Sequence, residues 1–203
     1  MKNLEIVWRT LADSALSGKR NWKSLREISE ASGVAPSTTH QALGRLIEIG
    51  AVEQNPISGL TVVSPQKLLE SLAAERSLQA KALAYTTLDA AKNLLANPEF
   101  SYALGGTLAA VHHLGGENKV ATHGQRIIYT PQLISQSELP ESDEVIILKL
   151  DPLAARTWTD GFTSLAQTYA DLWASPGWQS AEFLEALKDD FSHTRDWEQK
   201  SIA

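Results

Sequence analysis

Residues 25–63 read LREISEASGVAPSTTHQALGRLIEIGAVEQNPISGLTVV, and this stretch predicts two helices followed by two short strands. Apolar or small residues recur at helical spacing in two runs, which are Leu25, Ile28 and Ala31, then Thr39, Ala42, Leu43, Leu46 and Ile49. Gly33 ends the first run, and Pro36 suits the first turn of the second helix. Residues 52–63 alternate around a turn-rich segment at 55–59. The pattern predicts a helix-turn-helix with a following hairpin.

The outward side of the second predicted helix carries five polar residues and no acid among them. They are Ser37, Thr38, His40, Gln41 and Arg45. Hydroxyl, amide and guanidinium groups on a helix can reach base edges and phosphates in a major groove. An ordinary solvated helix face is the alternative for such residues. The complete helix-turn-helix and hairpin favour the first interpretation, so these five residues are the candidate DNA-binding set.

Residues 25–54 resemble the winged helix-turn-helix of many bacterial transcriptional regulators. The turn at 33–39 and the spacing Leu43-x-x-Leu46-x-x-x-Gly50 carry the resemblance, which covers about a third of the chain. Thr39 stands where such sequences usually show valine, a change that would loosen the core without breaking the pattern. The resemblance implies a regulator that binds double-stranded DNA, and within that class a repressor.

The composition permits one large domain or two small ones. The chain has 203 residues, of which 43% are hydrophobic, enough for a packed core. It contains no cysteine, so disulfides and thiolate chemistry are excluded, and zinc would need histidines and carboxylates alone. No apolar run approaches the length of a membrane span or a secretory signal. We therefore expect a cytoplasmic protein without a membrane partner.

The net charge of −6 is unevenly distributed along the chain. Residues 1–70 hold eight basic and seven acidic residues, whereas the remaining 133 hold ten and seventeen. A near-neutral segment can make the few phosphate contacts of a specific DNA site, but it is poorly suited to coating DNA non-specifically.

Residues 66–97 contain neither glycine nor proline and are rich in leucine, which predicts one long helix or two helices that meet near 73–77. A long helix after a winged helix often dimerises such regulators, so a homodimer is expected; a helix packed on its own chain is the alternative. The predicted organisation is a winged helix-turn-helix DNA-binding domain over 1–65, a helical linker or dimerisation segment over 66–97, and a regulatory or interaction domain over 98–203.

The last of these domains predicts a small sheet packed with helices. Its expected elements are a helix over 100–114 that Gly105-Gly106 precedes or interrupts, a hairpin over 119–130, a buried strand over 145–150, and helices over 162–173 and 180–193. The predicted fold class is therefore α+β, with an N-terminal winged helix-turn-helix and a C-terminal small sheet packed with helices.

Residues 102–115, YALGGTLAAVHHLG, resemble a segment of the abortive-infection toxin–antitoxin proteins. In that system a nucleotidyltransferase-like toxin partners a winged-helix antitoxin, AbiEi, that represses its own operon. The order of domains here is similar to that of the antitoxin. The resemblance implies an antitoxin-like autoregulator whose second domain is a degenerate nucleotidyltransferase-like domain.

An active nucleotidyltransferase is the enzymatic alternative, because Gly105-Gly106-Thr107 at a helix start could bring backbone amides to phosphates. That chemistry needs two carboxylates one residue apart on the next strand to hold a metal pair. Residues 117–123 contain no Asp-x-Asp, so we expect no catalytic residue, no metal and no cofactor, and a packing role for the glycines. A winged helix that binds protein instead of DNA is the other alternative. In the DNA-binding regulator, the second domain would serve dimerisation or bind a small-molecule effector or a protein partner.

His112-His113 and four tryptophans are the remaining candidates for a site. Adjacent histidines on a helix point about 100° apart, so one buried and one exposed ring is favoured over a shared metal. The tryptophans either line a ligand cavity or anchor the helical layer, and the second interpretation is favoured. They are Trp158, Trp173, Trp178 and Trp197.

Overall fold

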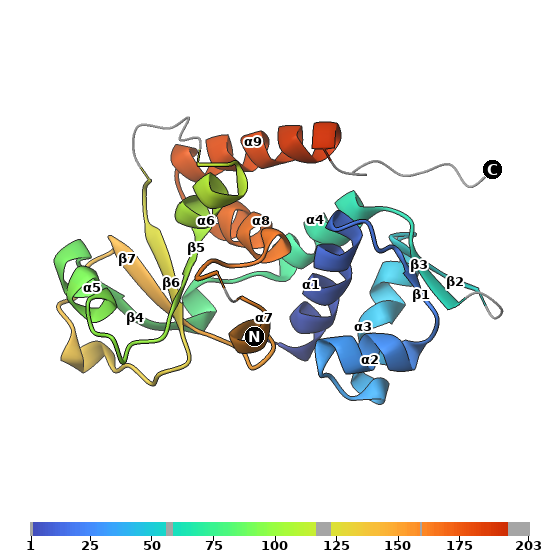
Figure 1. Cartoon of the computed structure of the whole chain (residues 1–203), viewed down its shortest axis with the longest axis horizontal. Coiled ribbons are helices and arrows are strands. Elements are labelled where there is room, and N and C mark those ends of the chain that lie inside the picture. Colours follow the sequence, from blue (N-terminus) through green and yellow to red (C-terminus); the bar gives the residue numbers. More distant parts are fainter. Residues whose placement is uncertain (1, 56–58, 117–122, 159, 195–203) are drawn as a thin grey trace. The chain divides into compact units, whose positions relative to one another are not determined.

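The computed structural model describes residues 2–55, 59–116, 123–158 and 160–194. The chain forms two compact units. Among the described residues, the N-terminal unit comprises those within 2–76 together with 188–194, and the second unit comprises those within 77–187. Helices and strands occur in both (Figure 1), which confirms the predicted mixed fold.

The N-terminal unit contains the predicted helix-turn-helix and hairpin. Its elements are α1 (Asn3–Leu16), β1 (Asn21–Trp22), α2 (Leu25–Ser32), α3 (Pro36–Glu48), β2 (Val52–Asn55), β3 (Gly59–Val62) and α4 (Pro65–Glu75). The strands form an antiparallel sheet in the order β1-β3-β2. Residues 56–58, at the predicted tip of the hairpin, lie outside the described residues.

Local signals in the sequence account for the ends of these helices. The side chain of Ser24 accepts a hydrogen bond from the Glu27 amide and caps α2, which ends at Gly33 in the left-handed conformation. Pro36 stands in the first turn of α3, where its missing amide proton is not needed. The turn between the two helices is therefore held at both sides.

Helix α1 packs against α2, α3 and α4. The indole nitrogen of Trp8 donates to the carbonyl oxygen of Ala42 at 2.6 Å, which joins α1 to α3. On α4, Leu68, Leu69 and Leu72 are fully buried. The leucine-rich side of α4 is thus occupied within the chain, and dimerisation through other parts of residues 66–97 stays a prediction.

The prediction that residues 66–97 are helical is wrong in the middle of the segment. A short 3-10 turn (Gln79–Lys81) and strand β4 (Ala82–Thr86) separate α4 from α5 (Leu88–Leu95). β4 pairs with β7 (Val145–Lys149), whose residues lie 59–66 positions further along the chain than their partners, and the side-chain amide of Gln136 bonds the backbone of Tyr85 at 2.7 and 2.9 Å. Such distant partners override the local helical preference of the segment.

The second unit is built on a four-stranded sheet in the order β4-β7-β6-β5. β6 (Arg126–Thr130) and β7 (Val145–Lys149) are parallel, and the other neighbours are antiparallel. β7 confirms the buried strand that the sequence predicts over residues 145–150. The helix predicted over 100–114 is shorter than expected, because residues 103–105 form β5 (Ala103–Gly105) and α6 (Gly106–His113) begins after it. Residues 120–122, the first strand of the predicted hairpin, lie outside the described residues, and β6 pairs with β5 and β7 instead.

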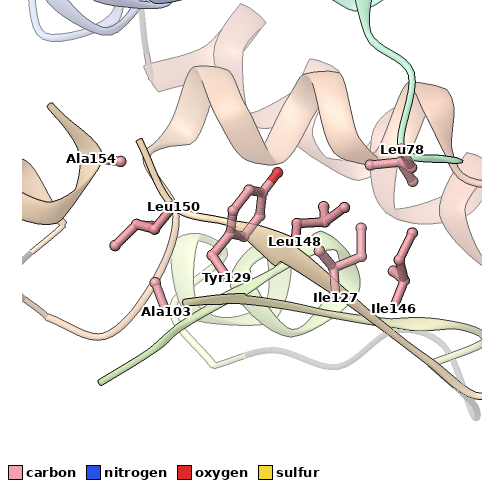
Figure 2. Close-up of a cluster of buried hydrophobic side chains, with 8 residues drawn as sticks. All are labelled: Leu78, Ala103, Ile127, Tyr129, Ile146, Leu148, Leu150 and Ala154. Carbon is pink, nitrogen blue, oxygen red and sulfur yellow. The ribbon is translucent and has the colours of Figure 1, made fainter. Parts of the chain in front are cut away.

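Both faces of this sheet are covered, as alternate residues of its central strands show. One face carries a cluster that includes Ile127, Tyr129, Ile146 and Leu148 (Figure 2). Ile128 and Ile147 belong to a second cluster on the opposite face.

The helices that follow the sheet are α7 (Ala154–Thr157), α8 (Leu165–Ala174) and α9 (Trp178–Thr194). No helix in the described part of the chain is both long and apolar enough to cross a membrane.

Two glycines with the same backbone conformation provide a matched test of the hairpin. Gly18 and Gly59 both have φ near +90°, but a Cβ on Gly18 would meet nothing within 4 Å. A Cβ on Gly59 would run into the carbonyl oxygens of Trp22 and Lys23, the latter at 2.7 Å. We expect Gly18→Ala to cost about 1–2 kcal/mol of unfolding free energy through conformational strain alone. Gly59→Ala should cost about 1–3 kcal/mol more, since β1 and β3 must separate.

Urea unfolding of the two variants and the wild type measures both costs. Equal destabilisation by the two substitutions would contradict the close approach of β3 to the chain at Trp22.

Candidate nucleic-acid interface

Helix α3 places the five predicted DNA-binding residues together on its accessible side. Four of them are exposed and Thr38 is half-buried; the exposed four are Ser37, His40, Gln41 and Arg45. The opposite side is buried through Thr39, Ala42, Leu43 and Leu46. The burial pattern therefore leaves one polar face of α3 free for a ligand.

Thr39 does not loosen the core, although the sequence suggested that it would. Its hydroxyl donates to the carbonyl oxygens of Val34 at 3.2 Å and Ala35 at 3.1 Å. A buried hydroxyl that is hydrogen-bonded avoids the desolvation penalty of an unpaired one. Thr39 thus ties the start of α3 to the turn before it.

Sequence reasoning missed an acid on the same face. The carboxylate of Glu48 lies 2.9 Å from the guanidinium of Arg45, and the two side chains are 68% and 61% exposed. Glu48 follows Gln41 by seven residues, so a helical projection would have placed it on this arc. Gly44, also exposed, was missed as well. Arg45 is consequently balanced by a neighbouring negative charge.

A hollow of about 200 Å³ lies beside α3 and brings His40 next to residues from other elements. Its lining includes Lys23, before α2, and Gln54 and Asn55, at the end of β2. Ile47 adds an apolar side chain from α3 that is 37% exposed. The structure thus joins His40 with the hairpin, a proximity that the sequence did not reveal.

Most basic residues before and on α2 are already engaged. Lys19 contacts Glu27 at 2.8 Å and lies 3.8 Å from the centre of the Trp22 ring. Its hydrogen bond lowers the pKa of Glu27. Arg26 pairs with Glu30 at 2.7 Å, and this hydrogen bond raises the pKa of Arg26. Surface pairs of this kind add little stability, but they reduce the positive potential that attracts phosphates.

The Gly105-Gly106 turn has a packing explanation. A Cβ on Gly105 would lie 3.0 Å from the Tyr129 ring and 3.3 Å from the carboxylate of Asp171. Asp171 is fully buried and accepts hydrogen bonds from the Tyr129 hydroxyl at 2.7 and 2.8 Å and from Gln167 at 2.9 Å. A phosphate at this turn would meet a buried carboxylate, which disfavours the cradle considered from the sequence.

The two adjacent histidines have separate partners. His112 is exposed, stacks on Phe162 at 4.1 Å between ring centroids, and lies 3.1 Å from the Asp160 carboxylate. The Nε2 atom of the half-buried His113 lies 2.8 Å from the carbonyl oxygen of Thr163. Within the described residues, no three histidine or acidic side chains are grouped so as to hold a metal ion.

The prediction that the tryptophans anchor the helical layer is wrong for two of them. Trp158 is partly buried against the sheet cluster, but Trp173 and Trp178 are 50% and 61% exposed. Trp197 lies outside the described residues. Neither exposed ring lines the hollow beside α3 or the open hollow of the second unit, whose lining includes His123 and Arg126.

The second unit has a wider, open hollow of about 690 Å³. His123, Arg126, Asp143 and Gln179 contribute to its lining. Burial, followed by the charge of Arg126, lowers the pKa of His123. Because the hollow presents groups of both charge signs, its lining does not indicate one class of effector.

Replacing the Tyr129 hydroxyl tests the polar cluster beside the glycine turn. Tyr129→Phe leaves the buried Asp171 carboxylate without one of its donors, so we expect a loss of about 1.5–3 kcal/mol of unfolding free energy. Tyr102→Phe is the control, because Tyr102 is 38% exposed. Denaturant unfolding compares the two variants, and equal stability would show that Asp171 does not depend on this hydroxyl.

Comparison with known proteins gives a single finding, and it concerns the helix-turn-helix of the N-terminal unit. Residues 14–56 match the model of the IclR helix-turn-helix domain, a span that contains α2, α3 and β2. No curated protein and no solved structure matches the chain. The resemblance of the second unit to abortive-infection antitoxins therefore stays a prediction. The N-terminal unit thus contains a segment similar to the IclR helix-turn-helix domain, which supports DNA binding and transcription regulation.

Proposed function

We propose that this protein is a sequence-specific repressor that reads double-stranded DNA with α3. The observation that carries the proposal is the polar, exposed face of α3 within the matched helix-turn-helix domain. In such domains the second helix enters the major groove, and its side chains contact base edges. The five residues predicted from the sequence are the proposed contacts.

Each position suits a different kind of contact. The amide of Gln41 can bond adenine through both its donor and its acceptor, and the guanidinium of Arg45 can bond guanine or a phosphate. Ser37 and Thr38 lie in the first turn of α3, where hydroxyls and free backbone amides suit phosphate oxygens. His40, beside the hairpin, would face the edge of the same groove.

A homodimer on a repeated half-site would supply the affinity that one copy lacks. A single DNA-binding module buries about 600–1,000 Å² of protein surface, at the low end for specific complexes. The ion pairs of α2 and α3 also limit the contribution of phosphate contacts. Because the leucines of α4 are buried, the proposed dimer forms through another surface.

In its most specific form, the proposal is an antitoxin-like repressor in the cytoplasm of a bacterium. The second unit would then bind a protein partner or a small-molecule effector, and occupation of that unit would change the affinity for DNA. A nucleotidyltransferase encoded next to this protein would support the antitoxin-like role.

Selection from random duplex DNA, with wild type and variants in parallel, tests the function. We expect the wild type to enrich two copies of one short sequence. Gln41→Ala should relax the preference at one base pair and cost about 1–3 kcal/mol at the selected site. Arg45→Ala should weaken all sequences more evenly and reduce the salt dependence by about one phosphate contact.

Gln66→Ala is the matched control, because it removes an exposed amide from α4 instead of α3. A Gln41→Ala/Arg45→Ala double variant that selects the same sequence with wild-type affinity would rule out α3 as the reading helix. Failure of the wild type to enrich any sequence would favour a winged helix that binds protein.

Glu48→Gln should tighten DNA binding. The substitution removes a negative charge from the proposed interface and releases Arg45 from its ion pair. Because both side chains are exposed, we expect an increase in affinity of about two- to fivefold for all sequences. Asp89→Asn is the control, since Asp89 forms an equivalent i,i+3 pair with Lys92 in the second unit. Titrations at constant salt measure both, and a Glu48→Gln affinity equal to that of the control would contradict this role.

A further inference from the structure

Gly44 is the ninth residue of the thirteen-residue helix α3, and nothing in the fold requires a glycine there. Its backbone is not in the left-handed region, unlike that of most glycines in the chain. A Cβ on Gly44 would meet no atom within 4 Å. By contrast, a Cβ on Gly59 would clash with backbone oxygens, and a Cβ on Gly105 would lie only 3.0–3.3 Å from neighbouring side chains.

Glycine at this position nevertheless lowers the stability of the folded chain. In the interior of an exposed helix, glycine lowers the ratio of folded to unfolded chains about fivefold relative to alanine. Neither a turn, nor a helix end, nor a close contact within the described residues accounts for that loss. Close approach of a partner outside the chain to the helix backbone is a role that would account for a glycine at this position.

The position of Gly44 indicates what approaches it. Residues three and four apart are neighbours on a helix surface, so Gly44 adjoins His40 and Gln41 on one side and Glu48 on the other. All of them are exposed. Gly44 therefore lies in the middle of the face that we propose reads DNA.

We infer that Gly44 is the point at which the backbone of α3 comes closest to DNA. The inference rests on the proposed function and adds a positioning residue to it. A bare backbone at this point lets the helix lie deep in the groove, so that the amide of Gln41 can reach a base edge while the hydroxyl of Ser37 reaches a phosphate. A methyl group there would hold the helix away from the groove and lengthen those contacts.

Gly44→Ala should therefore make the protein more stable and, at the same time, weaken its binding to DNA. We expect its melting temperature to rise by about 2–8 °C, because alanine favours the helix. Its affinity for the sequence selected by the wild type should fall at least tenfold, and Gly44→Leu should bind more weakly still. Thermal unfolding of the full chain and titration of the selected duplex give the two numbers.

Ser71→Ala is the control for stabilisation itself. Ser71 lies on α4 and its hydroxyl bonds the carbonyl oxygen of Lys67, so alanine raises helix preference there without changing α3. This variant should bind the duplex as the wild type does.

Wild-type affinity in Gly44→Ala would overturn the inference and leave the proposed function intact. A lower melting temperature for Gly44→Ala would also overturn it, because the glycine would then serve the fold. If the wild type selects no DNA sequence, the proposed function itself fails, and this inference with it.

Discussion

The hydrogen bond from Trp8 to the carbonyl oxygen of Ala42 sets the position of α3, and the candidate site depends on that position. α1 packs on three other helices, and the bond fixes it to the middle of α3. With Leu43 and Leu46 buried, the rotation of α3 about its axis is determined. The residues left outside are therefore a consequence of core packing, and the same packing holds the face that we propose reads DNA.

The sequence predicted the helix-turn-helix well because its signals are local. Proline, glycine and a serine cap mark the ends of α2 and α3 within a few residues of each boundary. β1 and β4 gave no such signal, because their partners are distant: Asn21 pairs with Thr61, and Ala84 with Ile147. A two-residue strand has no periodicity of its own, and the leucines around β4 suggested a helix that its tertiary partner overrides.

The candidate site was only partly predictable for a different reason. From the sequence, we looked for side chains that can contact DNA, which are hydroxyls, amides and cations. The five residues chosen in this way are accessible on α3. Such a choice overlooks residues that would act by opposing a contact or by leaving space, which are the roles we propose for Glu48 and Gly44. The exposed Trp173 and Trp178 were misplaced because apolar composition cannot show which side of a helix the rest of the chain covers.

The charges of the N-terminal unit favour discrimination over attraction. Arg26 and Arg45 are each paired with a glutamate, so their long-range electrostatic attraction for the phosphate backbone is weak. Residues 71–203 carry seven net negative charges, which oppose non-specific binding further. If the proposed function holds, the affinity for DNA comes mainly from short-range contacts inside the groove. Such contacts decay within an ångström or so, whereas screened charges act over about 10 Å. The depth at which α3 lies in the groove would therefore decide which sequences are bound.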